Sequence, residues 1–128
     1  MSKMGYNAST LGNHEFDNGI EKLAKVLKNA NFPFLNANYT LKNTPLEDKI
    51  KSYEIFDLNG IKIGVFGLGI DLEGLVEKKL YKGIEYIDPV DISNDISYDL
   101  KLNKKCDLVI CLSHLGLVCQ GLKRYCHE

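Results

Sequence analysis

The sequence Gly12-Asn13-His14-Glu15-Phe16-Asp17-Asn18-Gly19 joins a short apolar run to an amphipathic helix. The run before it, residues 6–11, predicts a strand, and the periodic pattern of residues 20–30 predicts a helix with one apolar face. An amide, an imidazole and two carboxylates lie between Asn13 and Asp17. Because α/β proteins place ligand-binding and catalytic groups where strands pass into helices, we expect a functional site in this segment.

The predicted helix is part of a strand–helix–strand unit. Asn18 and Glu21 have the spacing of a capping box, which predicts that the helix begins beside Asn18. After the helix, Pro33 precedes a short apolar stretch that predicts a second strand beginning near Phe34. Two strands joined by a helix favour a parallel pairing with a crossover connection.

The middle of the chain predicts a loop followed by a β-hairpin. Residues 39–51 are polar and contain Pro45, which favours an irregular connection. Two strand-like stretches, 53–58 and 61–66, flank Asn59-Gly60. Asparagine and glycine accept the positive φ angles of a type I′ turn, so these stretches are expected to pair directly.

A second helix and a last strand follow. Asp88 and Pro89 have the residue types of an N-cap and a first helical position, and the apolar spacing continues one helix face. The aliphatic run 107–112 predicts a strand buried on both faces, with Ser113-His114 just past its end.

Composition indicates a single globular domain. The chain has 128 residues, 45% of them apolar, and a formal net charge of -1. This balance gives no electrostatic footprint for nucleic acid or an anionic membrane. No stretch approaches the roughly 20 apolar residues of a membrane-spanning helix, and the start of the chain has no apolar signal region. From the sequence as written we therefore expect a cytoplasmic protein.

The four cysteines, Cys106, Cys111, Cys119 and Cys126, all lie in the last quarter of the chain. A disulfide framework would be distributed more evenly, so reduced thiols are expected. A zinc site from Cys119, Cys126 and His127 is disfavoured because no C-x-x-C pair is present.

Two loops that carry polar groups are expected to converge. The segment Asn13 to Asp17 and the pair Ser113-His114 each follow a predicted strand, and such ends meet at one edge of a parallel sheet. An amide oxygen and an imidazole suit a divalent ion such as Zn²⁺ or Mn²⁺. A histidine followed three residues later by an aspartate suits proton transfer or charge stabilisation. The combination favours metal-assisted hydrolysis over catalysis by a serine or cysteine nucleophile.

The segment Gly12 to Gly19 and the later Ser113-His114-Leu115-Gly116 resemble motifs of the calcineurin-like metallophosphoesterases, specifically the 5′-nucleotidase branch. Residues 34–38 and 61–67 are similar to that branch as well, so the resemblance covers about residues 3 to 116. It implies an α/β fold, part of a four-layer α/β/β/α sandwich. It also implies two divalent metal ions of the Zn, Mn, Mg, Ca or Co type, and hydrolysis of phosphoesters of nucleotides or related compounds by metal-activated water.

The resemblance assigns roles to individual residues. Asn13 and His114 would be ligands of the second metal. His14 would stabilise charge on the phosphoryl oxygens or protonate the leaving group, and Asp17 would orient it. Glu15 would have a supporting role.

Other parts of the family pattern are not found in this sequence. The family has an Asp-x-His and a Gly-Asp motif before the matched region and a Gly-His-x-His loop after it. We therefore expect residues 1–116 to be a partial metallophosphoesterase domain, residues 117–128 to be a divergent tail, and the chain to be inactive alone. The alternatives are a non-catalytic remnant or interaction module that self-associates through unpaired sheet edges, and a frameshift product. Complete relatives are often periplasmic, cell-surface or secreted.

Overall fold

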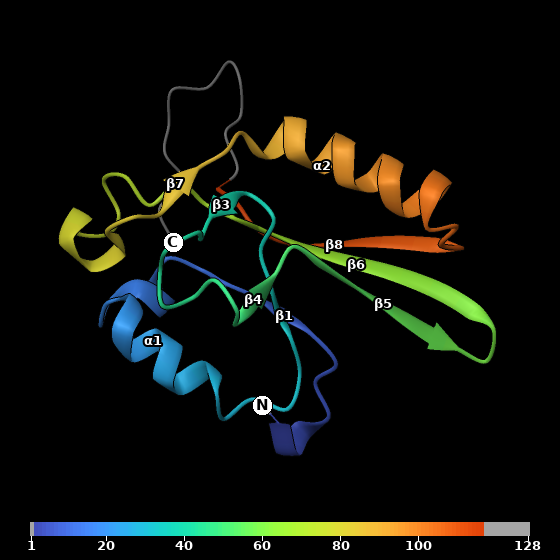
Figure 1. Ribbon diagram of the computed structural model, residues 1–128, viewed down its shortest axis with the longest axis horizontal. Coiled ribbons are helices and arrows are strands. Elements are labelled where there is room, and N and C mark those ends of the chain that lie inside the picture. The colour runs from blue at the N-terminus through green and yellow to red at the C-terminus, as the bar shows by residue number, and fades with distance from the viewer. Residues whose placement is uncertain (1, 117–128) are drawn as a thin grey trace.

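The computed structural model describes residues 2–116, which form a mixed α/β structure with four layers (Figure 1). The first sheet has the order β1 (Ser9–Thr10), β2 (Phe34–Leu35), β4 (Ile50–Lys51), and the second has the order β5 (Tyr53–Leu58), β6 (Ile61–Gly69), β8 (Leu108–His114). A small pair joins β3 (Tyr39–Thr40) to β7 (Glu85–Tyr86). The helices are α1 (Ile20–Leu27) and α2 (Pro89–Tyr98), with short helical turns η1 (Ser2–Met4), η2 (His14–Phe16), η3 (Lys78–Tyr81) and η4 (Asp99–Asn103).

The two sheets face each other, and one helix covers the outer face of each (Figure 1). Helix α1 buries Ile20, Leu23, Ala24 and Leu27 in a cluster with Leu11 and Phe16. Helix α2 contributes Ile96 to a second cluster with Phe66 of β6. Between the sheets, Gly67 of β6 lies against the backbone of Leu35 in β2. The α/β/β/α sandwich expected from the resemblance is therefore confirmed for the described part of the chain.

Local signals in the sequence predicted several elements correctly. β1 and β2 pair in parallel across α1, and β5 pairs with β6 in an antiparallel hairpin. Asn59 and Gly60 have φ angles of 56° and 89°, as a type I′ turn requires. Asp88 caps α2 because its side chain accepts hydrogen bonds from the backbone amides of Val90 and Asp91.

The predicted start of the first helix needs a correction. The N-cap of α1 is Gly19, with φ 80° and ψ 159°, and no side chain caps the helix. The capping box between Asn18 and Glu21 is therefore wrong. The turn η2 ends beside Asp17, and the chain then needs a glycine conformation to enter α1. The helix ends at Leu27 rather than at Ala30.

The strands also differ from the prediction. Only Ser9–Thr10 of the predicted strand 6–11 is paired, and the expected loop 39–51 contains β3 and β4. Strand β8 includes Ser113 and His114 and is not buried on both faces, since Leu108 is 49% exposed. The reason is topological: among the described residues, β8 pairs with β6 alone and lies at the edge of its sheet.

Within residues 2–116, no helix is long and apolar enough to cross a membrane. The predicted tail 117–128 lies outside the described residues, as do Cys119, Cys126 and His127.

Candidate functional site

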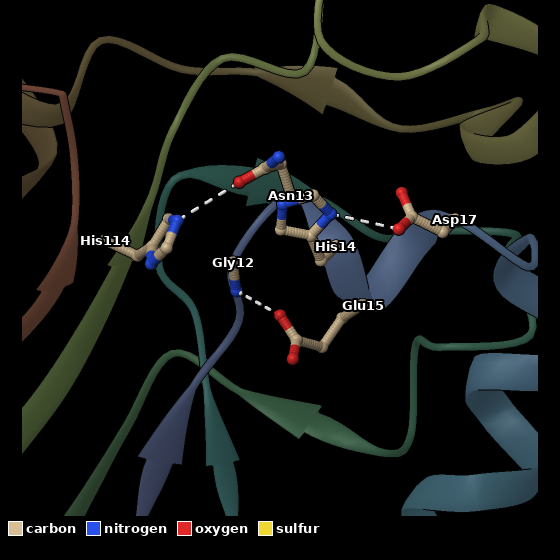
Figure 2. A network of polar contacts seen from close by, with 6 residues as sticks. All are labelled: Gly12, Asn13, His14, Glu15, Asp17 and His114. Carbon is tan, nitrogen blue, oxygen red and sulfur yellow. Dashed lines mark hydrogen bonds and ion pairs between the residues drawn. The ribbon is translucent and has the colours of Figure 1, made fainter. Parts of the chain in front are cut away.

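Asn13 and His114 meet at one end of the sandwich. Asn13 precedes η2 in the connection from β1 to α1, and His114 is the last residue of β8. His114 Nε2 lies 3.2 Å from Asn13 Oδ1, although 101 residues separate the two in the sequence (Figure 2). The expected convergence of the two loops is therefore observed. The strands belong to facing sheets, however, and not to one sheet as expected.

His14 and Asp17 form a second pair in the same segment. His14 Nδ1 lies 3.0 Å from Asp17 Oδ2, because one helical turn brings residues three apart onto the same side (Figure 2). The side chain of His14 is 81% exposed. Phe16, between them in sequence, is fully buried and packs edge-to-face on Tyr39, with ring centroids 5.9 Å apart. The buried phenylalanine anchors η2, so the imidazole is held outward with its second nitrogen free to meet a ligand.

Glu15 supports the backbone of the segment. Its carboxylate oxygen Oε2 accepts a hydrogen bond of 2.7 Å from the backbone amide of Gly12. A Cβ at Gly12 would lie 3.0 Å from His114 Nε2 and 3.1 Å from Glu15 Oε2. Gly12 therefore lets His114 approach the loop closely, and Glu15 has the supporting contact that the resemblance implied.

A buried polar layer beneath this site was not predicted from the sequence. Asn38 is fully buried; its Oδ1 accepts from the backbone amide of Gly69 and its Nδ2 donates to the Gly69 carbonyl, both at 2.8 Å. Gly69 is the register partner of His114. Asn38 thus ties the segment after β2 to the strand that positions His114. The available signal was the unusual presence of Asn36 and Asn38 in an apolar stretch.

Tyr39 belongs to the same layer and donates its hydroxyl hydrogen to the carbonyl of Ile70. Burial raises the pKa of the Tyr39 phenol, and the nearby Tyr86 and Asp71 raise it further. The pKa of Tyr86 is also raised, mainly by desolvation.

These raised pKa values predict a loss of stability at alkaline pH. The folded chain keeps the Tyr39 proton to a higher pH than the unfolded chain, in which the pKa is near the ordinary value of 10.0. The Tyr39 contribution to the free energy of unfolding should therefore be constant below about pH 10 and fall above it. Urea unfolding of the chain and of the Tyr39→Phe variant, at pH values from about 8 to about 11.5 that bracket the ordinary tyrosine pKa, measures this contribution as the difference between the two. Tyr39→Phe should make the fall shallower, and an unchanged slope would contradict the assignment.

The donor atoms of Asn13 and His114 are of types that suit a borderline divalent ion, but two donors are fewer than a metal site needs. Within residues 2–116, no group of three or more His, Cys, Asp or Glu side chains is placed to hold a metal. A tightly bound Zn²⁺ or Mn²⁺ needs further ligands beyond two neutral donors. Cys106 is buried and Cys111 lies on β8 in an exposed position, and both are free thiols, as predicted for these two residues. Partial desolvation of its sulfur nevertheless raises the pKa of the Cys111 thiol.

Comparison with known proteins gives the context of this site. No protein-family model matches the chain. A 5′-nucleotidase of Vibrio vulnificus is 42% identical over 117 residues, which are 91% of this chain and 21% of that protein. The structure of a 5′-nucleotidase precursor from Thermus thermophilus matches with a TM-score of 0.79 and 32% identity, over 87% of this chain and 22% of that one. The calcineurin-like phosphoesterase YfkN from Bacillus subtilis matches with a TM-score of 0.75 and 30% identity, over 94% of this chain and 38% of that one.

The chain thus spans about a fifth of the length of the 5′-nucleotidases that it matches. The Thermus protein is a 5′-nucleotidase precursor. The cytoplasmic location expected from the sequence is not supported by these relatives. The resemblance inferred from the motifs is confirmed by sequence and by fold. The chain is a homologue of one segment of the 5′-nucleotidases and has the fold of that segment, which is that of the calcineurin-like phosphoesterases.

Proposed function

We propose that this chain forms part of a metal-dependent phosphoesterase domain and carries one side of its catalytic centre, with nucleotide phosphoesters as the substrate class. The observation that carries the proposal is the approach of His114 Nε2 to Asn13 Oδ1, next to the His14–Asp17 pair. The similarity to proteins named 5′-nucleotidase over 91% of the chain supports the substrate class. Residues 1–116 are the proposed part of that domain.

The side chains divide the chemistry between them. Asn13 Oδ1 and His114 Nε2 would be two ligands of a divalent ion, in agreement with their mutual approach. When bound, such an ion polarises a phosphoryl group and makes hydroxide available near neutral pH. His14 would donate a hydrogen bond or a proton to a phosphoryl or leaving-group oxygen, and Asp17 would accept from His14 Nδ1 and hold the imidazole in its orientation. The exposure of His14 would leave it accessible to a substrate.

A second candidate function is a non-catalytic interaction module. It is favoured by the edge position of β8, where Leu108 and Ile110 are partly exposed, since unpaired edges of this kind promote self-association. Size-exclusion chromatography with light scattering separates the two: a monomer that binds a divalent ion at His114 contradicts the interaction module.

Metal binding is tested first on the full chain. Added Mn²⁺ should broaden the ring-proton NMR signals of His114, because the paramagnetic ion relaxes nuclei close to it. Asn13→Ala should raise the Mn²⁺ concentration needed for equal broadening by at least about tenfold, since loss of even a supporting residue has this effect on metal affinity. Asn29→Ala, at an exposed position after α1, should change nothing. Equal broadening with and without the Asn13 side chain would contradict the assignment.

Catalysis is tested in a chimera, in which the 117 matched residues replace the aligned segment of the Vibrio vulnificus 5′-nucleotidase. The chimera should release phosphate from a nucleoside 5′-monophosphate with Mn²⁺ and should lose this activity with a chelator. A chimera that folds, as judged by cooperative thermal unfolding, but releases no phosphate would contradict the proposed function.

A further inference from the structure

Asn36 has a buried side-chain amide without a partner. Its side chain is 2% exposed, and neither Oδ1 nor Nδ2 has a hydrogen-bond partner among residues 2–116. The backbone of Asn36 is fixed, because its backbone N–H donates a hydrogen bond of 2.8 Å to the carbonyl of Lys51. An amide taken out of water without new hydrogen bonds costs free energy, so native structures nearly always supply a partner or a bound water.

Asn38 shows what the same side chain does when it is satisfied. It lies two residues further along, is equally buried, and makes two hydrogen bonds of 2.8 Å with the backbone of Gly69. Burial at this end of β2 therefore does not by itself prevent an asparagine from being paired. Asn36 also lies close to Gly69, but the backbone amide and carbonyl of that glycine bond to Asn38 and not to Asn36.

The position of Asn36 links the two strand ends that carry Asn13 and His114. Its Nδ2 lies 2.7 Å from the point where a Cβ of Gly69 would be, and Gly69 is the register partner of His114. On the other side, the parallel register of Thr10 with Leu35 places Asn36 next to the chain that leads into Gly12 and Asn13. The unpaired amide therefore lies between the facing sheets, beneath the site.

Tyr39 provides a polar atom in the same place. Its hydroxyl oxygen also lies against the Cα hydrogen of Gly69, and its hydrogen is donated to the carbonyl of Ile70. The oxygen still has a lone pair that can accept a hydrogen bond. An amide with a donor and an acceptor, beside a hydroxyl oxygen, supplies the two to four polar contacts that a buried water needs.

We propose that Asn36 is a positioning residue: its amide binds a buried water molecule that bridges to Tyr39, and this bridge sets the separation of the strand ends carrying Asn13 and His114. The proposal rests on the proposed function for the role of that pair. The water itself is inferred, independently of that function, from the buried unpaired amide and the neighbouring Tyr39 hydroxyl. Asn36 would then act through the positions of Asn13 and His114, without contact to a substrate.

The test compares three variants of the full chain in urea unfolding and in the Mn²⁺ titration of His114. Asn36→Leu keeps the size of the side chain but cannot hold the water, so its urea midpoint should fall and the Mn²⁺ concentration for equal broadening should rise about tenfold. Asn36→Ser keeps a hydroxyl and leaves space for a water, so its Mn²⁺ response should stay close to that of the unmodified chain. Asn29→Leu, at an exposed asparagine, is the control.

Each result decides the proposal. A higher urea midpoint for Asn36→Leu would overturn it, because removing an amide that binds nothing relieves a cost. A lower midpoint with an unchanged Mn²⁺ response would overturn the positioning role. If the leucine variant does not fold, Asn36→Ala is measured in the same way, since it removes the amide without adding bulk. If the unmodified chain shows no Mn²⁺ response, the proposed function fails, whereas the direction of the midpoint shift still tests the water.

Discussion

Replacing His14 with alanine in the chimera is expected to lower kcat for phosphate release by about 10²- to 10⁴-fold, the range for loss of a general acid or base. The reason is the proposed role of His14: its exposed imidazole lies on η2, and we propose that its second nitrogen meets a phosphoryl or leaving-group oxygen. Steady-state rates with saturating Mn²⁺ measure the effect. Metal affinity should be nearly unchanged, because His14 is not in contact with Asn13 Oδ1 or His114 Nε2 through any hydrogen bond of the described chain.

Two further variants sharpen this prediction. Asp17→Asn keeps the size of the side chain but weakens its hold on His14 Nδ1, and it should cost about 10- to 100-fold, as expected for a residue that orients a functional group. Glu21→Gln removes a nearby exposed carboxylate in the first turn of α1 and should leave kcat unchanged. A chimera that carries His14→Ala and keeps full activity would contradict the role given to the His14–Asp17 pair.

Gly67→Ala is expected to destabilise the chain strongly, and more than a change at Asn36 or Tyr39. A Cβ at Gly67 would lie 2.5 Å from the carbonyl carbon of Leu35, and it would also press on Thr10 Oγ1 at 2.9 Å. The obstacle is the backbone of the facing sheet, which cannot turn aside as a side chain can. The free energy of unfolding should fall by about 3 kcal/mol or more, at the upper end for an overpacked core. Urea unfolding of the full chain measures it.

Gly64 provides a matched control on the same strand. A Cβ there would lie 3.0 Å from Leu100 Cδ2 and 3.1 Å from Cys106 Sγ, which are ends of flexible side chains. Gly64→Ala should therefore cost about 1 kcal/mol, near the lower end for overpacking. Equal losses at Gly64 and Gly67 would mean that the close approach of the two sheets does not limit the volume at Gly67.

Features set by neighbouring residues could be predicted from the sequence. The hairpin turn depends on Asn59 and Gly60 alone, and the start of α2 depends on Asp88 and Pro89. The His14–Asp17 pair follows from the three-residue spacing on a helical turn. In each case the physical cause lies within about one turn of chain, so a single sequence contains it.

Features set by distant partners could not be predicted in the same way. Strands β3 and β4 are two residues long, and their pairing depends on β7 and β2 rather than on their own composition. The edge position of β8 depends on which strands flank it, so its aliphatic sequence wrongly favoured burial on both faces. Likewise, the sequence marks Asn36 and Asn38 only as unusual in an apolar stretch, and their burial close to Gly69 depends on a strand about thirty residues away.

The separation of Asn13 and His114 along the chain has a consequence for folding. Their contact closes a loop of 101 residues, nearly the whole described chain, and long loops are closed at an entropic cost that only many other native contacts can offset. The hairpin of β5 and β6 can form early because its contacts are local. The contact between Asn13 and His114 joins the two sheets, so it can form only after both sheets have docked. During synthesis on a ribosome, the site would therefore be absent until His114 has left the exit tunnel, however soon the motif at Asn13 has emerged.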